Sequence, residues 1–242
     1  MDYRIGFSSG TFPDLTANEI ISILHNTGSK TIDLRVGKRQ RWEEDGIAPF
    51  LANNIQIAFI GTSVVLGDEY WNEEHLEIWT RPYQDYSIRV FAKCGCTEGW
   101  RKNLLINQIQ TLVKILGSAD KILIETHHGY SNVDEILRIH EITGTHVLLD
   151  TMGLARITDD PEYDAGRLAL ISSAMQVKGF NWSDPEKSLH LPLAQTDMER
   201  NLKILNCITK HSSIITIESR AGVPLEDIST LKSMLSHSTR EE

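Results

Sequence analysis

Three carboxylates stand at the ends of short apolar segments in the second half of the chain: Glu125, Asp150 and Glu218. Such short segments, bounded by turn residues, predict buried β-strands. If these strands are parallel, their carboxyl ends meet, and three carboxylates gathered there repel one another unless a cation neutralises them. The pattern predicts a divalent metal ion among the three carboxylates. The alternative is that each carboxylate caps a neighbouring helix or pairs with a side-chain cation.

Other polar side chains follow the same strands and are candidates for contact with a substrate. His127 shares the inward face with Glu125, which makes it the best placed of the nine histidines, and Lys178 shares a face with Gln176. Indole faces can stack on the C–H faces of sugar rings, although a tryptophan can equally anchor a loop. The remaining substrate-binding candidates are Arg35, Trp42, Trp182, His190 and Arg220.

The elements that must position these residues alternate along the chain without a linker. Thr16 and Glu19 have the spacing of a capping box, and residues 103–116 carry apolar side chains at helical spacing. A helix after nearly every strand requires parallel crossovers, so residues 1–242 are expected to form a single (β/α)8 TIM-barrel domain, with an open doubly wound sheet as the alternative. The predicted strands are 4–7, 31–36, 55–60, 88–93, 121–126, 146–150, 174–178 and 214–218, and a short helix is expected near 73–80.

Composition narrows the classes of partner. The 242 residues are 40% apolar with a formal net charge of −9, and no run of Lys or Arg exceeds two residues, so nucleic acid is not an expected partner. No apolar run approaches the roughly 20 residues that span a bilayer, and no signal peptide or glycine-rich nucleotide loop is recognised. We therefore expect a cytoplasmic protein that has no membrane partner and binds a small molecule, and we leave open whether it forms a homo-oligomer.

Seven short motifs carry a resemblance to a known family. They are IGF at 5–7, TFPD at 11–14, IDLR at 32–35, IETH at 124–127, LDT at 149–151, QVK at 176–178 and IESR at 217–220. In this order they resemble the xylose-isomerase-like TIM-barrel superfamily of sugar isomerases and epimerases. That superfamily also contains endonucleases acting at abasic sites, but the histidine-rich zinc cluster of those enzymes is missing here.

The resemblance implies one divalent metal ion held by Glu125, Asp150, Gln176 and Glu218. Gln176 stands where the family usually has His, and Gly153 stands where many epimerases have a further His. A set of oxygen ligands favours Mn²⁺ or Mg²⁺ over Zn²⁺.

The resemblance further implies proton abstraction next to the carbonyl of a sugar or sugar derivative. Glu125 and Glu218 would then lie on opposite faces of an enediolate, and Lys178 and His127 would stabilise its oxyanion. Two alternatives stay open. One is a lyase or dehydratase that uses the same site; the other is a non-catalytic barrel whose metal has been replaced by Lys178 and Arg220.

Overall fold

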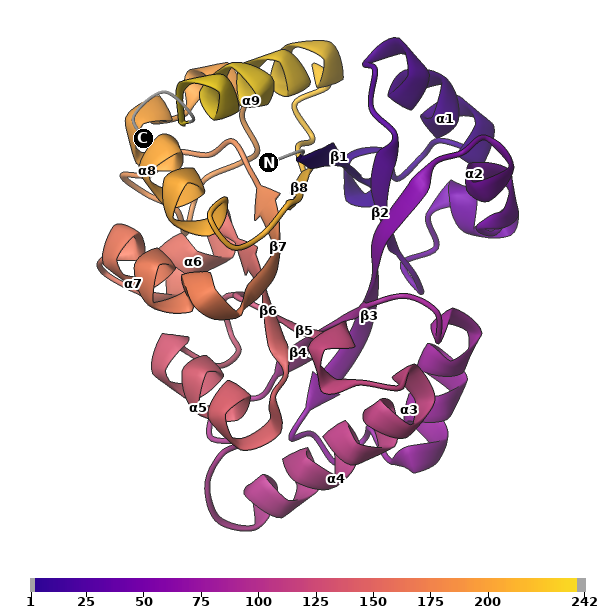
Figure 1. The fold of residues 1–242 in the computed structure, drawn as a ribbon, viewed down its shortest axis with the longest axis vertical. Coiled ribbons are helices and arrows are strands. Elements are labelled where there is room, and N and C mark those ends of the chain that lie inside the picture. Colours follow the sequence, from indigo (N-terminus) through magenta and orange to yellow (C-terminus); the bar gives the residue numbers. More distant parts are fainter. Residues whose placement is uncertain (1–2, 239–242) are drawn as a thin grey trace.

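In the computed structural model, which describes residues 3–238 and side chains up to residue 236, eight parallel strands close into a barrel in the order of the sequence (Figure 1). β1 pairs with β2 on one side and with β8 on the other, which closes the sheet. The predicted barrel is confirmed, and the open sheet is excluded. The strands are β1 (Arg4–Ser8), β2 (Thr31–Arg35), β3 (Gln56–Leu66), β4 (Ile88–Ala92), β5 (Ile122–Glu125), β6 (His146–Asp150), β7 (Ser172–Val177) and β8 (Ile214–Ile217).

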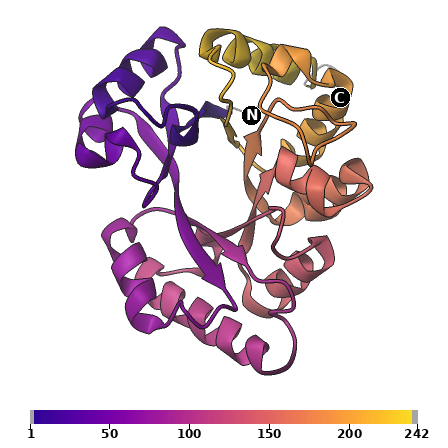
Figure 2. The same ribbon diagram turned by 180° about the vertical axis from the view of Figure 1, so that it is seen from behind.

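Helices surround the barrel on its outer face, as the two opposite views show (Figure 1 and Figure 2). The capping box of Thr16 and Glu19 opens α1 as predicted, and the helix expected near 73–80 is α3. Within residues 3–238, no helix is long and apolar enough to cross a membrane. The helices are α1 (Ala17–Asn26), α2 (Ala48–Ala52), α3 (Glu73–Thr80), α4 (Gly99–Leu116), α5 (Val133–Thr143), α6 (Thr151–Ile157), α7 (Pro161–Leu168), α8 (Met198–Ile208) and α9 (Pro224–Ser238).

Two apolar clusters form the core. The larger one fills the layer between strands and helices. The smaller one consists of Phe59, Leu123, Leu148 and Ala174. Because side chains alternate between the two faces of a strand, Leu123 shares its face with Glu125. The same alternation puts Leu148 on one face with Asp150, so apolar residues fill the barrel interior below the polar residues at its carboxyl end.

Candidate active site

Three carboxylates and three cations meet at the carboxyl ends of the strands, where barrel enzymes hold their catalytic groups. Five of the six are buried, and Arg35 is half-buried. We call this group the mouth cluster; it consists of Arg35, Arg89, Glu125, Asp150, Lys178 and Glu218.

Lys178 lies between two of the carboxylates. Its Nζ atom is 2.6 Å from Oδ2 of Asp150 and 3.2 Å from Oε2 of Glu218. Burial alone would lower the pKa of Lys178, but the charges of Asp150 and Glu218 outweigh it and raise that pKa. The amine is therefore held as an ammonium ion.

Both oxygens of Glu218 are engaged, because Arg35 contacts Oε1 while Lys178 contacts Oε2. Burial would raise the pKa of this carboxyl, but Lys178 and Arg35 lower it to about 2. Gly10 packs directly against the Arg35–Glu218 pair. A Cβ atom at Gly10 would lie 2.8 Å from Oε1 of Glu218 and 2.9 Å from Nη1 of Arg35. Glu218 is thus ionised and held on two sides.

Asp150 also uses both of its oxygens. Oδ1 accepts a hydrogen bond of 2.6 Å from the backbone N–H of Gly153 and so caps α6, while Oδ2 meets Lys178. A Cβ atom at Gly153 would lie 1.8 Å from the carbonyl oxygen of Thr126. Packing of α6 against the end of β5 therefore leaves no room for a side chain at the position where the family resemblance suggested a histidine.

Glu125 is paired with Arg89, whose Nε lies 2.9 Å from Oε2. Nη1 of Arg89 donates a hydrogen bond of 2.8 Å to the carbonyl of Thr62, and the guanidinium lies 4.6 Å from the centre of the Phe91 ring. The contact with Arg89 engages one carboxylate oxygen of Glu125 and leaves the other without a hydrogen bond from the described residues.

Hydroxyl groups fix the strand ends that carry these side chains. The Thr126 hydroxyl donates to the carbonyl of Asp150 at 3.0 Å and accepts from its N–H at 2.9 Å, joining β5 to β6. The hydroxyl of Thr151 accepts from the N–H of Lys178 at 3.0 Å. The backbone positions of Asp150 and Lys178 are thereby fixed relative to each other.

Asp33 lies inside the barrel and accepts hydrogen bonds from Ser8 Oγ at 2.7 Å and from Gln176 Nε2 at 3.1 Å. Burial is the main cause that raises the pKa of Asp33 to about 6. Gln176 is thus engaged with Asp33. Asp33 lies two residues before Arg35 on β2, so the two side chains point to the same face of this strand.

Comparisons with known proteins bear on the fold alone. No family model matches the sequence, and no curated protein matches it significantly. Solved structures do match: L-ribulose 3-epimerase (TM-score 0.72, 11% identity, 100% of this chain and 97% of that one) and a xylose isomerase domain containing protein from Salmonella typhimurium LT2 (0.71, 12%, 99% and 100%). A third is the probable 3-DHS dehydratase AsbF from Bacillus anthracis (0.69, 14%, 96% and 99%).

The chain has the xylose isomerase-like barrel fold. At these identities the likeness establishes the fold, which the sequence motifs had predicted, and leaves the reaction to be argued from the site.

The four ligands expected in a xylose isomerase-like barrel do not fit a metal ion as they are arranged. Asp150 and Glu218 have both oxygens engaged, Glu125 is paired with Arg89, and the Gln176 amide points its nitrogen at Asp33. In the part of the chain that the structure describes, no group of three or more His, Cys, Asp or Glu side chains could hold a metal.

The structure brings His190 to the mouth cluster and leaves two other predicted residues at its edge. Nδ1 of His190 lies 3.2 Å from the carbonyl oxygen of Glu218, and burial, reinforced by Lys178, lowers the pKa of His190. Arg220 is exposed, and its Nε donates to the carbonyl of Gly10 at 3.4 Å. His127 packs against the rings of Phe91 and Tyr130 and contacts the His128 carbonyl at 2.7 Å, so its described partners lie outside the mouth cluster.

The structure places Trp42 in the core, and no contact of its ring with the mouth cluster is found among the described residues. Its side chain is 2% exposed, packs edge-on against Phe50 and donates its indole N–H to Gln40 at 2.7 Å. Trp182 is likewise a packing residue, covered by Phe180 and by the guanidinium of Arg200. Both rings belong to the core between helices and strands because the segments that carry them fold back onto that layer.

Arg89 is the member of the mouth cluster that the sequence reasoning missed. It is the charged residue in the otherwise apolar β4, all of whose residues are buried. That isolation was a usable signal, since an unpaired arginine is almost never fully buried. Gly61 on the neighbouring β3 provides its space: a Cβ atom there would lie 2.7 Å from Nη2 of Arg89.

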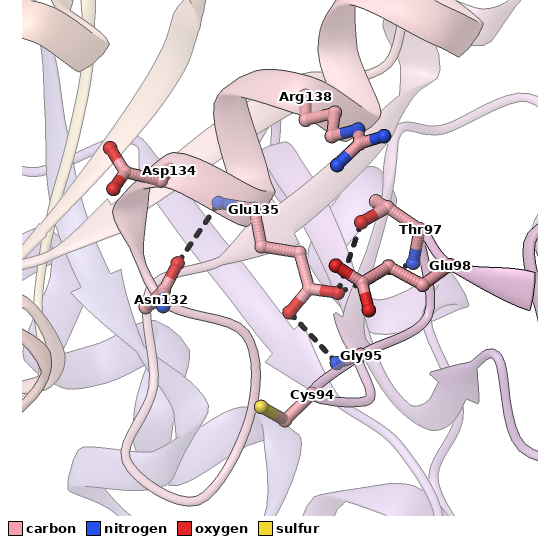
Figure 3. Close-up of a pocket in the computed structure, with 8 residues that line it drawn as sticks. All are labelled: Cys94, Gly95, Thr97, Glu98, Asn132, Asp134, Glu135 and Arg138. Carbon is pink, nitrogen blue, oxygen red and sulfur yellow. Dashed lines mark hydrogen bonds between the residues drawn. The ribbon is translucent and has the colours of Figure 1, made fainter.

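A hollow lies beside the barrel, between the loop that follows β4 and the start of α5 (Figure 3). Its volume is about 390 Å³. The carboxylate of Glu135 accepts hydrogen bonds there from the N–H groups of Gly95 at 3.1 Å and Thr97 at 3.3 Å. Glu135 therefore ties the loop to α5.

Proposed function

We propose that this protein is an enzyme that isomerises or epimerises a sugar or sugar derivative by moving a proton next to a carbonyl group. The observation that supports this most is the mouth cluster. Buried charges at the catalytic end of a barrel are costly to stability, and such clusters occur preferentially at functional sites. The fold, shared with a structure described as an L-ribulose 3-epimerase, agrees with this proposal.

The chain's own residues can supply the two groups that such a reaction requires, a cation that stabilises an oxyanion and a base that removes a proton. A C–H bond next to a carbonyl becomes acidic enough only when the developing oxyanion is stabilised and a base lies within reach. Lys178 and Arg35 are the cationic donors for that oxygen, and both interact electrostatically with Glu125. We assign Glu125 as the base because one of its oxygens is not engaged by Arg89.

Glu218 is assigned to the opposite face of the substrate, where it exchanges a proton with the enediolate. In the free protein it is a weak base, because its pKa is lowered to about 2 by Lys178 and Arg35. A substrate oxygen that takes over donors from either cation weakens these contacts and raises the basicity of Glu218. The catalytic state thus depends on the bound substrate.

The rim of the mouth favours a substrate with a negative group. The charges of the mouth cluster balance one another, and Lys38 lies beside the cluster. Burial and the charges of Arg35 and Arg89 lower the pKa of Lys38. The exposed Arg220 adds a further positive charge, although the whole chain carries a net charge of −9. We expect a carboxylate or phosphate on the substrate.

Solvent exchange tests the proposal. The protein is incubated in D2O with a panel of neutral, carboxylated and phosphorylated sugars, and deuterium uptake next to the carbonyl is followed by NMR. We expect uptake with at least one anionic sugar and its loss in Glu125→Gln. The matched control is Glu141→Gln on an exposed position of α5. Full exchange in Glu125→Gln would refute the assigned base, and the absence of exchange across the panel would refute the proposed reaction.

A dehydratase or lyase is the second candidate, and Lys178 is the residue that favours it. Its ammonium is fixed at the mouth and could stabilise the negative charge on a departing hydroxyl group by a hydrogen bond. A structure with the same fold is described as a probable dehydratase. Product mass separates the two reactions, since an isomer has the mass of its substrate and a dehydration product is lighter by one water.

The cytoplasmic location of the protein and its assembly into a homo-oligomer stay predictions.

A further inference from the structure

The oxygens that would bind a metal at the barrel mouth already surround a side-chain cation. Lys178 Nζ lies 2.6 Å from Asp150 Oδ2 and 3.2 Å from Glu218 Oε2. The side chain of Lys178 is 10% exposed, so the ammonium is largely removed from solvent. Both contacts are ion pairs. An ammonium group has three N–H donors, so it has the capacity to bind a substrate oxygen as well.

Charge balance argues against a divalent ion in addition to this lysine. The three carboxylates of the mouth cluster are matched by Arg35, Arg89 and Lys178. A divalent ion placed among them would add two positive charges to a balanced cluster, of which the ionised Asp33 carboxylate near Arg35 can offset one. The uncompensated buried charge that stays is strongly unfavourable. Metal binding would therefore require Lys178 to move out of the cluster.

The remaining contacts hold Lys178 in place. Its backbone N–H donates to Thr151. The other oxygen of Asp150 is committed to the start of α6, and the other oxygen of Glu218 is committed to Arg35. Gln176, two residues before Lys178 on the same face, is held by Asp33. The arrangement is therefore built around the ammonium group.

We infer that Lys178 replaces the divalent metal in this xylose isomerase-like barrel, so that its ammonium supplies the positive charge at the site and the protein binds no metal there. The inference deepens the proposed function by naming the cation that would stabilise the substrate oxyanion. Its test is a binding measurement that does not depend on turnover.

Metal content and thermal stability test the inference in the full chain. Wild-type protein is loaded with excess Mn²⁺, Mg²⁺ or Zn²⁺, dialysed and analysed for metal, and its unfolding temperature is measured with each ion and with a chelator. We expect less than a tenth of an equivalent of metal and no change of unfolding temperature. One equivalent retained, together with a chelator-sensitive unfolding temperature, would overturn the inference.

Lys178→Met is the informative variant, because it keeps much of the side-chain volume and removes the charge. We expect it to bind Mn²⁺ or Zn²⁺ at least tenfold more tightly than wild type and to unfold at a higher temperature when the ion is present. Lys30→Met, on an exposed position, is the matched control and should bind no metal. A folded Lys178→Met that gains no affinity contradicts the inference; if this variant does not fold, the wild-type measurements decide.

The two proposals can fail separately. Deuterium exchange that persists in the presence of a chelator supports both the proposed reaction and the inference about Lys178. A metal-free protein that exchanges no proton with any sugar keeps the role of Lys178 as the site cation and removes the proposed reaction. Exchange that needs one bound metal ion keeps the reaction and removes the inference about Lys178.

Discussion

Replacing Arg89 by methionine is expected to destabilise the protein strongly through Glu125. Arg89 and Glu125 are 3% and 5% exposed and lie 2.9 Å apart, so the substitution leaves a carboxylate buried without its partner. Breaking such a pair costs about 3–5 kcal/mol. In a domain of this size each kcal/mol lowers the unfolding temperature by roughly 2–4 °C, so we expect a decrease of roughly 6–20 °C.

A double-mutant cycle with Glu125→Gln separates the ion pair from the packing of Arg89. When both charges are removed, no uncompensated charge stays buried, and the double variant should be more stable than Arg89→Met alone. The matched control is Arg81→Met, because Arg81 pairs with Glu77 at 2.6 Å but both side chains are about half exposed. Such surface pairs contribute about 0–1 kcal/mol.

Urea denaturation of the four proteins of the cycle and of the control measures these free energies of unfolding. A loss below 1 kcal/mol in Arg89→Met, equal to that of Arg81→Met, would refute the reasoning that Arg89 neutralises a buried carboxylate. A double variant less stable than Arg89→Met would show that packing over Phe91, rather than charge, is the main contribution of Arg89.

Three further substitutions test other parts of the site. The pKa of Asp33 is raised to about 6 in the folded protein, so ionised Asp33 opposes folding, and its own contribution to stability should become more favourable as the pH falls from 7 towards 4. Asp33→Asn should remove this contribution, so the difference in free energy of unfolding between wild type and the variant should change with pH across that range. Gly10→Ala should separate Arg35 from Glu218, because its Cβ would lie 2.8 Å from the carboxylate; we expect kcat to fall at least tenfold in a folded protein whose Glu218 keeps its contact with Lys178. Trp42→Ala should cost about 3–5 kcal/mol of stability in urea denaturation, as core aromatics do, with KM unchanged.

Each of these has a result that contradicts it. A pH profile of stability that is the same in Asp33→Asn and wild type would show that ionised Asp33 does not destabilise the folded protein at neutral pH. Wild-type kcat in Gly10→Ala would show that the Arg35–Glu218 pair is not needed for turnover. A stable Trp42→Ala with a raised KM would restore a ligand contact for that ring.

The barrel was predictable because its signals are local. Strand positions follow from short apolar runs, and β6 was predicted with the bounds that it has in the structure. Helix starts follow from neighbouring residues, as at Thr16 and Glu19. Alternation along a strand also placed Glu125, Asp150 and Glu218 at the carboxyl ends, because it needs only the strand and its direction.

The partners of those carboxylates were decided by the tertiary structure alone. Arg35 and Glu218 are 183 residues apart in the chain, and Gln176 and Asp33 are 143 apart. Such contacts depend on the closure of the sheet and on its register, neither of which is written in any local pattern. The same holds for Trp42, whose burial depends on how its loop folds back. The sequence by itself determined that carboxylates gather at the barrel mouth, whereas three-dimensional distances decided that side-chain cations lie among them.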